Sequence, residues 1–461
     1  MKVSGKKVYT KSYAIPSVNF EDQELTSFGG LVIFQKLFHC LNLRERLIRC
    51  CKHLDNAKSY KHGSIVQILI VHLLLGYRKL QEAEFYRDDR MVRRTVGMNL
   101  LPSTSTISRY LGQVDQKGEQ RIEDLSSSLV EERLRYEMFP RVTLGFDGSV
   151  LSTNGHPEGS AVGFNRKKKG ARSYYPLLCT IAQTGQVLSV LHRSGNVHDS
   201  NGSVEFVRHC VERMRKILPR AVIEVRFDGA FFSEAMVKEL EALGVQYTMS
   251  VPFERFTELK ERIERRSVWW TVGRTSGELD YFEQRWQPKS WEQKGRFLFV
   301  RKHILQQRKE PLQLDLFEPR QPDCEYKVVL TNKSDSAKKV IRFHEGRGND
   351  EGIYGELKDQ LALGYVPGRK WVTNRLFLIA NVMAHNLTRE LQMSVAKQSR
   401  ATNEKRTPHW IFEGIQSMRR KFIHRAARLV RPDGRLTLSM QKNPAVEEKF
   451  THFLNLRRIW S

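Results

Sequence analysis

Three carboxylates lie at positions that suggest a chemical role. Asp147 lies within the run 142–150, which otherwise reads as a buried strand, and Asp228 ends a second apolar strand. Burying an acid is costly unless it binds a cation or another partner. Glu351 is a third acid, on a predicted helix. A single aspartate is more often a turn or capping residue, but three carboxylates without a histidine or cysteine cluster favour Mg²⁺ or Mn²⁺. Two such ions can promote phosphodiester displacement.

Glu351 belongs to a helix that is expected to start after a glycine-rich turn. Gly346 and Gly348 disfavour an earlier start, and Asn349 or Asp350 is a suitable N-cap. Apolar residues then recur at helical spacing, which predicts a side that faces a core. These residues are Ile353, Leu357 and Leu361.

A different face of this helix carries charged and small residues. Glu351 and Lys358 lie two turns apart and nearly in line. Gly352 and Gly355 each cost a helix about 1 kcal/mol relative to alanine, which suggests that another molecule approaches closely. The competing interpretation is an ordinary amphipathic helix with solvated charges.

The charge of the chain indicates a polyanionic partner. Its 461 residues include 77 Lys and Arg against 51 Asp and Glu, a formal net charge of +26. Nucleic acid is the first candidate and an anionic membrane surface the second. The longest apolar run, 65–76, is interrupted by polar residues and too short to span a bilayer. Six scattered cysteines without CxxC spacing predict free thiols in a reducing cytoplasm and no zinc site.

Changes of pattern along the chain predict an α/β protein with additional regions. A β-β-β-α-β-α-β order follows a helical start, and a β-rich, tryptophan-bearing segment interrupts it before the chain returns to helix. The predicted regions are 1–137 (helical N-terminal DNA-binding region), 138–251 (first part of the core), 252–340 (β-rich insertion), 341–395 (second part of the core) and 396–461 (basic helical C-terminal region).

Two further segments carry groups that suit DNA phosphates. Residues 101–110 combine a proline, a run of hydroxyls and a short helix with Arg109, as at the end of a helix-turn-helix. A plain capped helix explains the hydroxyls equally well. A basic loop that follows Asp147 would be a solvated turn in most proteins, but the net charge favours phosphate contact. Its basic residues are Arg166, Lys167, Lys168 and Lys169.

Taken together, these features resemble the insertion-sequence DDE transposases. Arg347, Glu351 and Lys358 match the spacing of that family's Y-x2-R-x3-E-x6-K signature, with His344 at the tyrosine position. Further segments look like the family's two aspartate motifs and neighbouring blocks. They are Gly145–Ser149, Arg226–Phe231, Asn165–Gly170, Ser173–Leu178 and Gly195–His198.

The resemblance implies an RNase H-like core and cut-and-paste transposition. A homodimer would bind double-stranded DNA with terminal inverted repeats and then target DNA. The protein would be cytoplasmic and associated with the nucleoid, and it would not bind a membrane. Asp147, Asp228 and Glu351 would ligate two Mg²⁺ (or Mn²⁺) ions. Arg347 and Lys358 would hold phosphates near the transferred end, and His344 could hydrogen-bond a phosphate in place of the tyrosine.

Relatives with a β-rich insertion use a tryptophan there to stack on a flipped base. For each tryptophan of this segment, packing within the insertion is the more frequent alternative. The candidates are Trp269, Trp270, Trp286 and Trp291.

Two other functions remain open from the sequence. One is a metal-dependent nuclease on the same fold that cuts DNA without joining it. The other is a non-catalytic, sequence-specific DNA-binding protein, against which the presence of all three acids counts.

Overall fold

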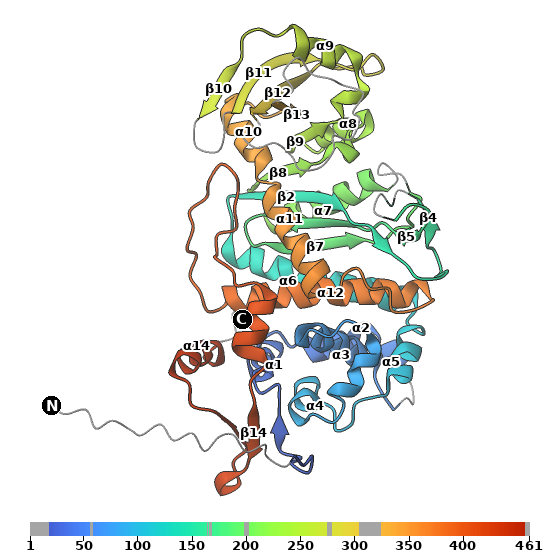
Figure 1. The fold of residues 1–461 in the computed structure, drawn as a ribbon, viewed down its shortest axis with the longest axis vertical. Coiled ribbons are helices and arrows are strands. Elements are labelled where there is room, and N and C mark those ends of the chain that lie inside the picture. The colour runs from blue at the N-terminus through green and yellow to red at the C-terminus, as the bar shows by residue number, and fades with distance from the viewer. Residues whose placement is uncertain are drawn as a thin grey trace, which may run out of the picture.

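A computed structural model describes residues 18–55, 59–163, 165, 168–197, 202–273, 279–303 and 324–456. The molecule is elongated, with a helical body at one end, a mixed sheet in the middle and a β-rich extension at the other end (Figure 1). No helix in these ranges is long and apolar enough to cross a membrane.

One large sheet runs through the middle and the extension. In the described residues it has nine strands. Their spatial order is β7 (Gln186–Leu191), β6 (Leu177–Ile181), β2 (Arg141–Gly148), β8 (Val222–Phe227), β9 (Gln246–Val251), β13 (Cys324–Thr331), β12 (Gly295–His303), β11 (Leu279–Trp286) and β10 (Trp270–Gly273).

The predicted β-β-β-α-β-α-β order is confirmed. β6 pairs antiparallel with both β2 and β7, whereas β8 and β9 run parallel to β2. The connecting helices α7 (Ser203–Ile217) and α8 (Glu234–Ala242) fall where the apolar periodicity placed them. A small sheet follows the carboxyl end of β2 and consists of β3 (Leu151–Ser152), β5 (Arg172–Tyr174) and β4 (Ala161–Val162).

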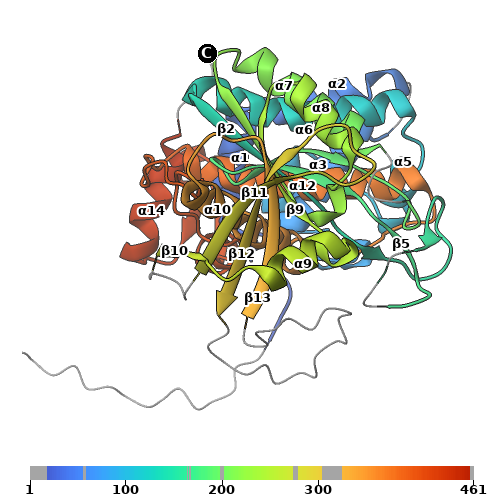
Figure 2. The same ribbon diagram turned by 90° about the horizontal axis from the view of Figure 1, so that it is seen from above.

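The predicted β-rich insertion contains the strands β10 to β13, but they do not form a sheet of their own. β13 pairs antiparallel with β9, for example Val328 with Val251, so the extension continues the central sheet. The apolar core is likewise continuous, because Phe282 and Phe297 of the extension belong to the same cluster as Met249 of β9. The predicted boundary at residue 252 therefore falls within one sheet (Figure 2).

The helical body is built around α3, whose 14 residues are all buried. The long helix α12 packs against α3, α6 and β7, and so joins the body to the sheet. The helices of the body are α1 (Leu31–Cys40), α2 (Leu43–Cys50), α3 (His62–Leu75), α4 (Arg90–Val96), α5 (Thr104–Leu111), α6 (Gln116–Glu137) and α12 (Trp371–Met393).

The C-terminal region adds a hairpin that the sequence analysis did not predict. Strand β14 (Ala427–Val430) pairs with β15 (Thr437–Met440) and with the early strand β1 (Leu25–Thr26). The expected basic helical region is therefore helical only in part. The hairpin strands alternate exposed residues with buried or half-buried ones and contain no long apolar run. Helices α13 (Ile415–Met418) and α14 (Pro444–Leu454) flank it.

The remaining elements are short or belong to the site. They are α9 (Thr257–Arg265), α10 (Ala337–Glu345), α11 (Gly348–Gly355), the 3₁₀-helices η1 (Lys52–Leu54), η2 (Leu80–Phe85), η3 (Gly229–Phe231), η4 (Phe253–Arg255) and η7 (Pro432–Gly434), and the π-helices η5 (Glu356–Gln360) and η6 (Arg419–Ile423). The six cysteines are free, as expected.

Candidate active site

The first two acids follow adjacent parallel strands in register. β2 and β8 pair Phe146 with Phe227, so Asp147 and Asp228 occupy the next position on each strand. Strands of one sheet lie about 4.8 Å apart, and successive side chains point to opposite faces. The rings of Phe146 and Phe227 stack at 5.3 Å on one face. The two aspartates therefore share the other face.

The two carboxylates repel each other in a partly buried place. Burial and the charge of Asp228 raise the pKa of Asp147 to about 6, against the opposing effects of the Arg347 guanidinium and the Gly148 amide. Each carboxylate also accepts a local backbone N–H, from Gly148 at 2.8 Å for Asp147 and from Ala230 at 3.0 Å for Asp228. Together with Arg347, these interactions offset only part of the rise in the pKa of Asp147.

Helix α11 lies across the face to which the acids point. The Tyr354 hydroxyl donates a hydrogen bond of 3.0 Å to the Asp147 carbonyl. The predicted core-facing residues Ile353, Leu357 and Leu361 are all buried. The predicted start of the helix was wrong: α11 begins at Gly348, because α10 runs to Glu345 and only a short corner separates the two helices.

Asp350 anchors α11 to the sheet. Its carboxylate lies 3.4 Å from the Arg226 guanidinium of β8 and accepts a 3.1 Å hydrogen bond from the Thr180 hydroxyl. Gly145 on β2 permits this approach, since a Cβ there would collide with Asp350. Arg226 also donates to the Lys405 carbonyl at 3.0 Å. The sequence analysis considered Asp350 only as a capping residue. Arg226, a charged residue within an apolar strand, indicated a buried partner in the same way as Asp147 did.

Glu351, the next residue, points away from this anchor. It is exposed on α11, next to a row of glycines at positions i, i+4 and i+7 of the helix. An added Cβ at any of them would meet nothing within 4 Å. These glycines are Gly348, Gly352 and Gly355. The predicted open face beside Glu351 is therefore present.

The acids suit a divalent cation by their chemistry. Asp147 and Asp228 offer hard oxygen ligands, and a cation between them would offset both the burial and the repulsion by Asp228 that raise the pKa of Asp147. Among the described residues, no three His, Cys, Asp or Glu side chains converge as a metal-binding group. The structure thus brings two of the predicted acids together and places the third on the adjoining helix.

Comparison with known proteins identifies the family of this chain. A family model described as transposase DDE domain group 1 matches residues 10–460. The chain belongs to this family. Its activity is accordingly DNA transposition. No curated protein matches the sequence.

Solved transposase complexes are similar in part. A piggyBac transposase synaptic complex with hairpin DNA has 12% identity and a TM-score of 0.44, over 86% of this chain and 80% of that one. A Mos1 transposase paired-end complex with the left transposon end has 9% identity and a TM-score of 0.18, over 42% and 60%.

In this DDE transposase, the basic signature residues have different surroundings. Arg347 precedes α11 and is close enough to Asp147 to lower the pKa of that acid. Lys358 is exposed on η5. Both therefore lie on the α11–η5 segment that carries Glu351.

His344 does not lie at the DNA-accessible surface. It is 8% exposed, and its ring nitrogens lie 3.0 Å from the Thr248 hydroxyl and 2.9 Å from the Ser250 hydroxyl. Burial and the nearby Arg347 and Arg226 lower its pKa to about 3. His344 is thus a neutral, buried link between α10 and β9, a position that does not suit the expected phosphate contact.

The predicted basic loop lies between β4 and β5. Lys168 and Lys169 are exposed, and this small sheet follows the end of β2 that carries Asp147. Arg166 and Lys167 lie outside the described residues. Arg109 is exposed on α5, the short helix that the hydroxyl run predicted, and Ser103 caps that helix.

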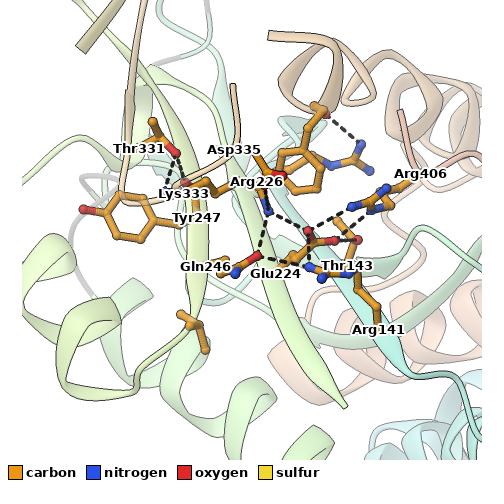
Figure 3. Close-up of polar contacts among 12 residues, drawn as sticks. Arg141, Thr143, Glu224, Arg226, Gln246, Tyr247, Thr331, Lys333, Asp335 and Arg406 are labelled. Carbon is orange, nitrogen blue, oxygen red and sulfur yellow. Dashed lines mark hydrogen bonds and ion pairs between the residues drawn. The ribbon is translucent and has the colours of Figure 1, made fainter. Parts of the chain in front are cut away.

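A buried ionic cluster fixes the corner that leads to α10 and α11. Figure 3 shows Glu224 of β8 among three cations, with contacts of 2.6 Å to Lys333, 2.9 Å to Arg406 and 2.7 Å to Arg141. Burial alone would raise the pKa of Glu224, but Arg406 and Lys333 lower it to about 2. Lys333 shortly precedes α10, and Arg406 lies beyond α12. The cluster therefore ties both segments to the strand that ends at Asp228.

The four candidate tryptophans differ in exposure. Trp286 is buried and bonds Glu258 at 2.8 Å, Trp291 stacks on a phenylalanine, and Trp269 packs on Phe282. Trp270 is 52% exposed on the edge strand β10. Packing thus accounts for three of the four.

Proposed function

We propose that this transposase cleaves DNA at transposon ends and joins the ends to a target, with two divalent ions held by Asp147, Asp228 and Glu351. Mg²⁺ is the expected ion, and Mn²⁺ should substitute. The observation that supports this most directly is the adjacency of Asp147 and Asp228 at the carboxyl ends of β2 and β8, with α11 across them. When bound, such ions activate the attacking oxygen and stabilise the leaving one.

The chain supplies positioning and charge around these ions. Asp350 and Arg226 hold α11, the helix that carries Glu351, against the sheet. The glycine face of α11 leaves room for a DNA strand to approach. Arg347 and Lys358 would bind its phosphates near the reacting bond, and Lys168 and Lys169 would contact the backbone farther along.

The strand order β7-β6-β2-β8-β9, with β2, β8 and β9 parallel, supports assignment of an RNase H-like core. We further propose a homodimer on DNA ends with inverted repeats, acting in the cytoplasm on the nucleoid. Analytical ultracentrifugation with end DNA tests the dimer, and a complex with one chain per pair of ends would contradict it.

The decisive experiment measures Mg²⁺-dependent cleavage of end DNA. Asp147→Ala, Asp228→Ala and Glu351→Ala should each abolish cleavage and leave DNA binding within a few-fold. Asp359→Ala is the matched control, because Asp359 is an exposed acid of η5, in the segment after α11. Cleavage that survives all three substitutions would refute the assignment.

Strand joining separates a transposase from a nuclease. Pre-cleaved ends with a free 3′-hydroxyl should be joined to a plasmid target by the wild type and by none of the three variants. Cleavage without joining would leave the nuclease as the better description.

A further inference from the structure

A second basic site lies in the helical body, apart from the acids. A pocket of about 680 Å³ opens between α4 and the β14–β15 hairpin. Five arginines and one glutamate line it, together with the apolar residues Met98, Leu429, Val430 and Leu436. The charged residues are Arg90, Arg93, Arg94, Arg428, Arg431 and Glu24.

The two walls of this pocket come from opposite ends of the chain. β1 joins them, because it pairs with β14 (Leu25 with Arg428) while the Thr26 hydroxyl donates to Asp89 at 2.8 Å. Asp89 is the N-cap of α4 and accepts the Met91 amide at 2.9 Å. The arginines are thus presented by fixed elements on both sides of one opening.

Part of the positive charge in the pocket is compensated. Arg90 pairs with Glu24, Arg93 with Asp88, and Arg428 with Asp22 at 3.0 Å. Arg94 and Arg431 are exposed and have no acidic partner within the described part of the chain. Such a concentration of like charge is unfavourable until an anion occupies it.

We propose that this pocket binds the phosphate backbone of duplex DNA at a distance from the catalytic acids. The inference rests on the proposed function, since transposition supplies the DNA. Guanidinium groups bind phosphate oxygens in a forked geometry. Figure 1 shows α4 and β14 near one end of the molecule and the strands β2 and β8 in its middle, so a duplex that contacts both regions would lie along the long axis. The apolar lining residues suit the deoxyribose groups between phosphates.

The test compares two double variants of the full-length protein. Arg94→Ala with Arg431→Ala removes the two uncompensated pocket charges. Arg121→Ala with Arg220→Ala is the control: both arginines are exposed, neither lines the pocket, and Arg220 lies at the opposite end of β8 from Asp228. Binding of a fluorescent mixed-sequence duplex is measured without divalent ions between about 50 and 200 mM salt.

The pocket variant should bind the duplex about tenfold more weakly, with a slope of log affinity against log salt shallower by about 2. The control should keep the slope of the wild type. An unchanged slope in the pocket variant would overturn the proposal, even if the acids prove catalytic. Binding of polyglutamate is measured in the same way. If the pocket variant bound polyglutamate more weakly but bound the duplex as the wild type does, the proposal would also be overturned, in favour of an acidic protein partner. Because the readout is binding without metal, it can succeed or fail independently of cleavage.

Discussion

The charged Asp147 side chain destabilises the folded state when no cation is bound, because burial and the nearby Asp228 both disfavour its carboxylate form. Its folded-state pKa of about 6 exceeds the ordinary value of 3.8, so the folded state holds the proton more tightly than the unfolded chain does. Protonation therefore stabilises the fold. In EDTA, this contribution should raise the free energy of unfolding as the pH falls from above 6 toward 4, by about 3 kcal/mol.

Asp147→Asn should remove this part of the pH dependence and stabilise the ion-free protein above pH 6 by a similar amount. Urea unfolding at several pH values measures both effects. Mg²⁺ should raise the unfolding midpoint of the wild type at neutral pH and have a smaller effect on the variant. Equal pH profiles for the two proteins would show that the folded state does not disfavour the charged form of Asp147.

Adjacent acids of α11 should give opposite phenotypes. Asp350→Asn breaks the buried contact with Arg226 and should lower the free energy of unfolding by about 3 kcal/mol or more. Glu351→Gln changes an exposed side chain and should alter stability by less than about 0.5 kcal/mol, while abolishing Mg²⁺-dependent cleavage. If Asp350→Asn were stable and inactive and Glu351→Gln fully active, the third acid would be Asp350.

Among the elements, α11 contains several residues that form helices poorly, yet its contacts with the sheet fix its position. The Cβ that Gly352→Ala adds would have no neighbour within 4 Å, so the substitution should stabilise the protein by up to about 1 kcal/mol. Because the new methyl group faces the proposed DNA path, end cleavage should nevertheless fall several-fold. Gly346→Ala is the contrasting change, since its Cβ would collide with Arg226 and the Lys405 carbonyl, and it should destabilise.

A stabilised Gly352→Ala protein with full cleavage activity would show that DNA does not approach this face. Thermal unfolding and cleavage rates, measured on the same preparations, separate the two effects.

How far the sequence predicted these elements depended on local pattern. The strand that contains Asp147, the strand before Asp228 and the helical character of the N-terminal region were predicted from their local apolar pattern. The role of Asp350 was not, since it depends on Arg226, Thr180 and Gly145, which are remote in sequence. His344 matched a signature position, yet the hydroxyls of β9 bind it inside the protein. Signature spacing predicted the segment but could not predict which side chains are exposed.

For the molecule as a whole, the continuous sheet carries Trp270 to the far edge of the extension. Trp270→Ala should leave the free energy of unfolding within about 0.5 kcal/mol but weaken processing of end DNA, because base stacking contributes about 1–3 kcal/mol per base. Trp286→Ala should instead cost about 3–5 kcal/mol of stability, since it empties a core position. Fluorescence of 2-aminopurine at the cleaved end reports a flipped base, and an unchanged signal in Trp270→Ala would exclude this tryptophan.

The pairing of β1 with β14 also sets the order in which the molecule can be completed during synthesis. Leu25 pairs with Arg428, so the first strand leaves the ribosome long before its partner exists. At about 5–20 residues per second, roughly 20–80 seconds separate the two. The central sheet and α11 can form within that interval, whereas the arginine pocket cannot. A nascent chain therefore contains the acids before the arginine pocket forms, and a prematurely terminated chain contains them without it. Translation of the C-terminal region completes the proposed DNA-binding surface.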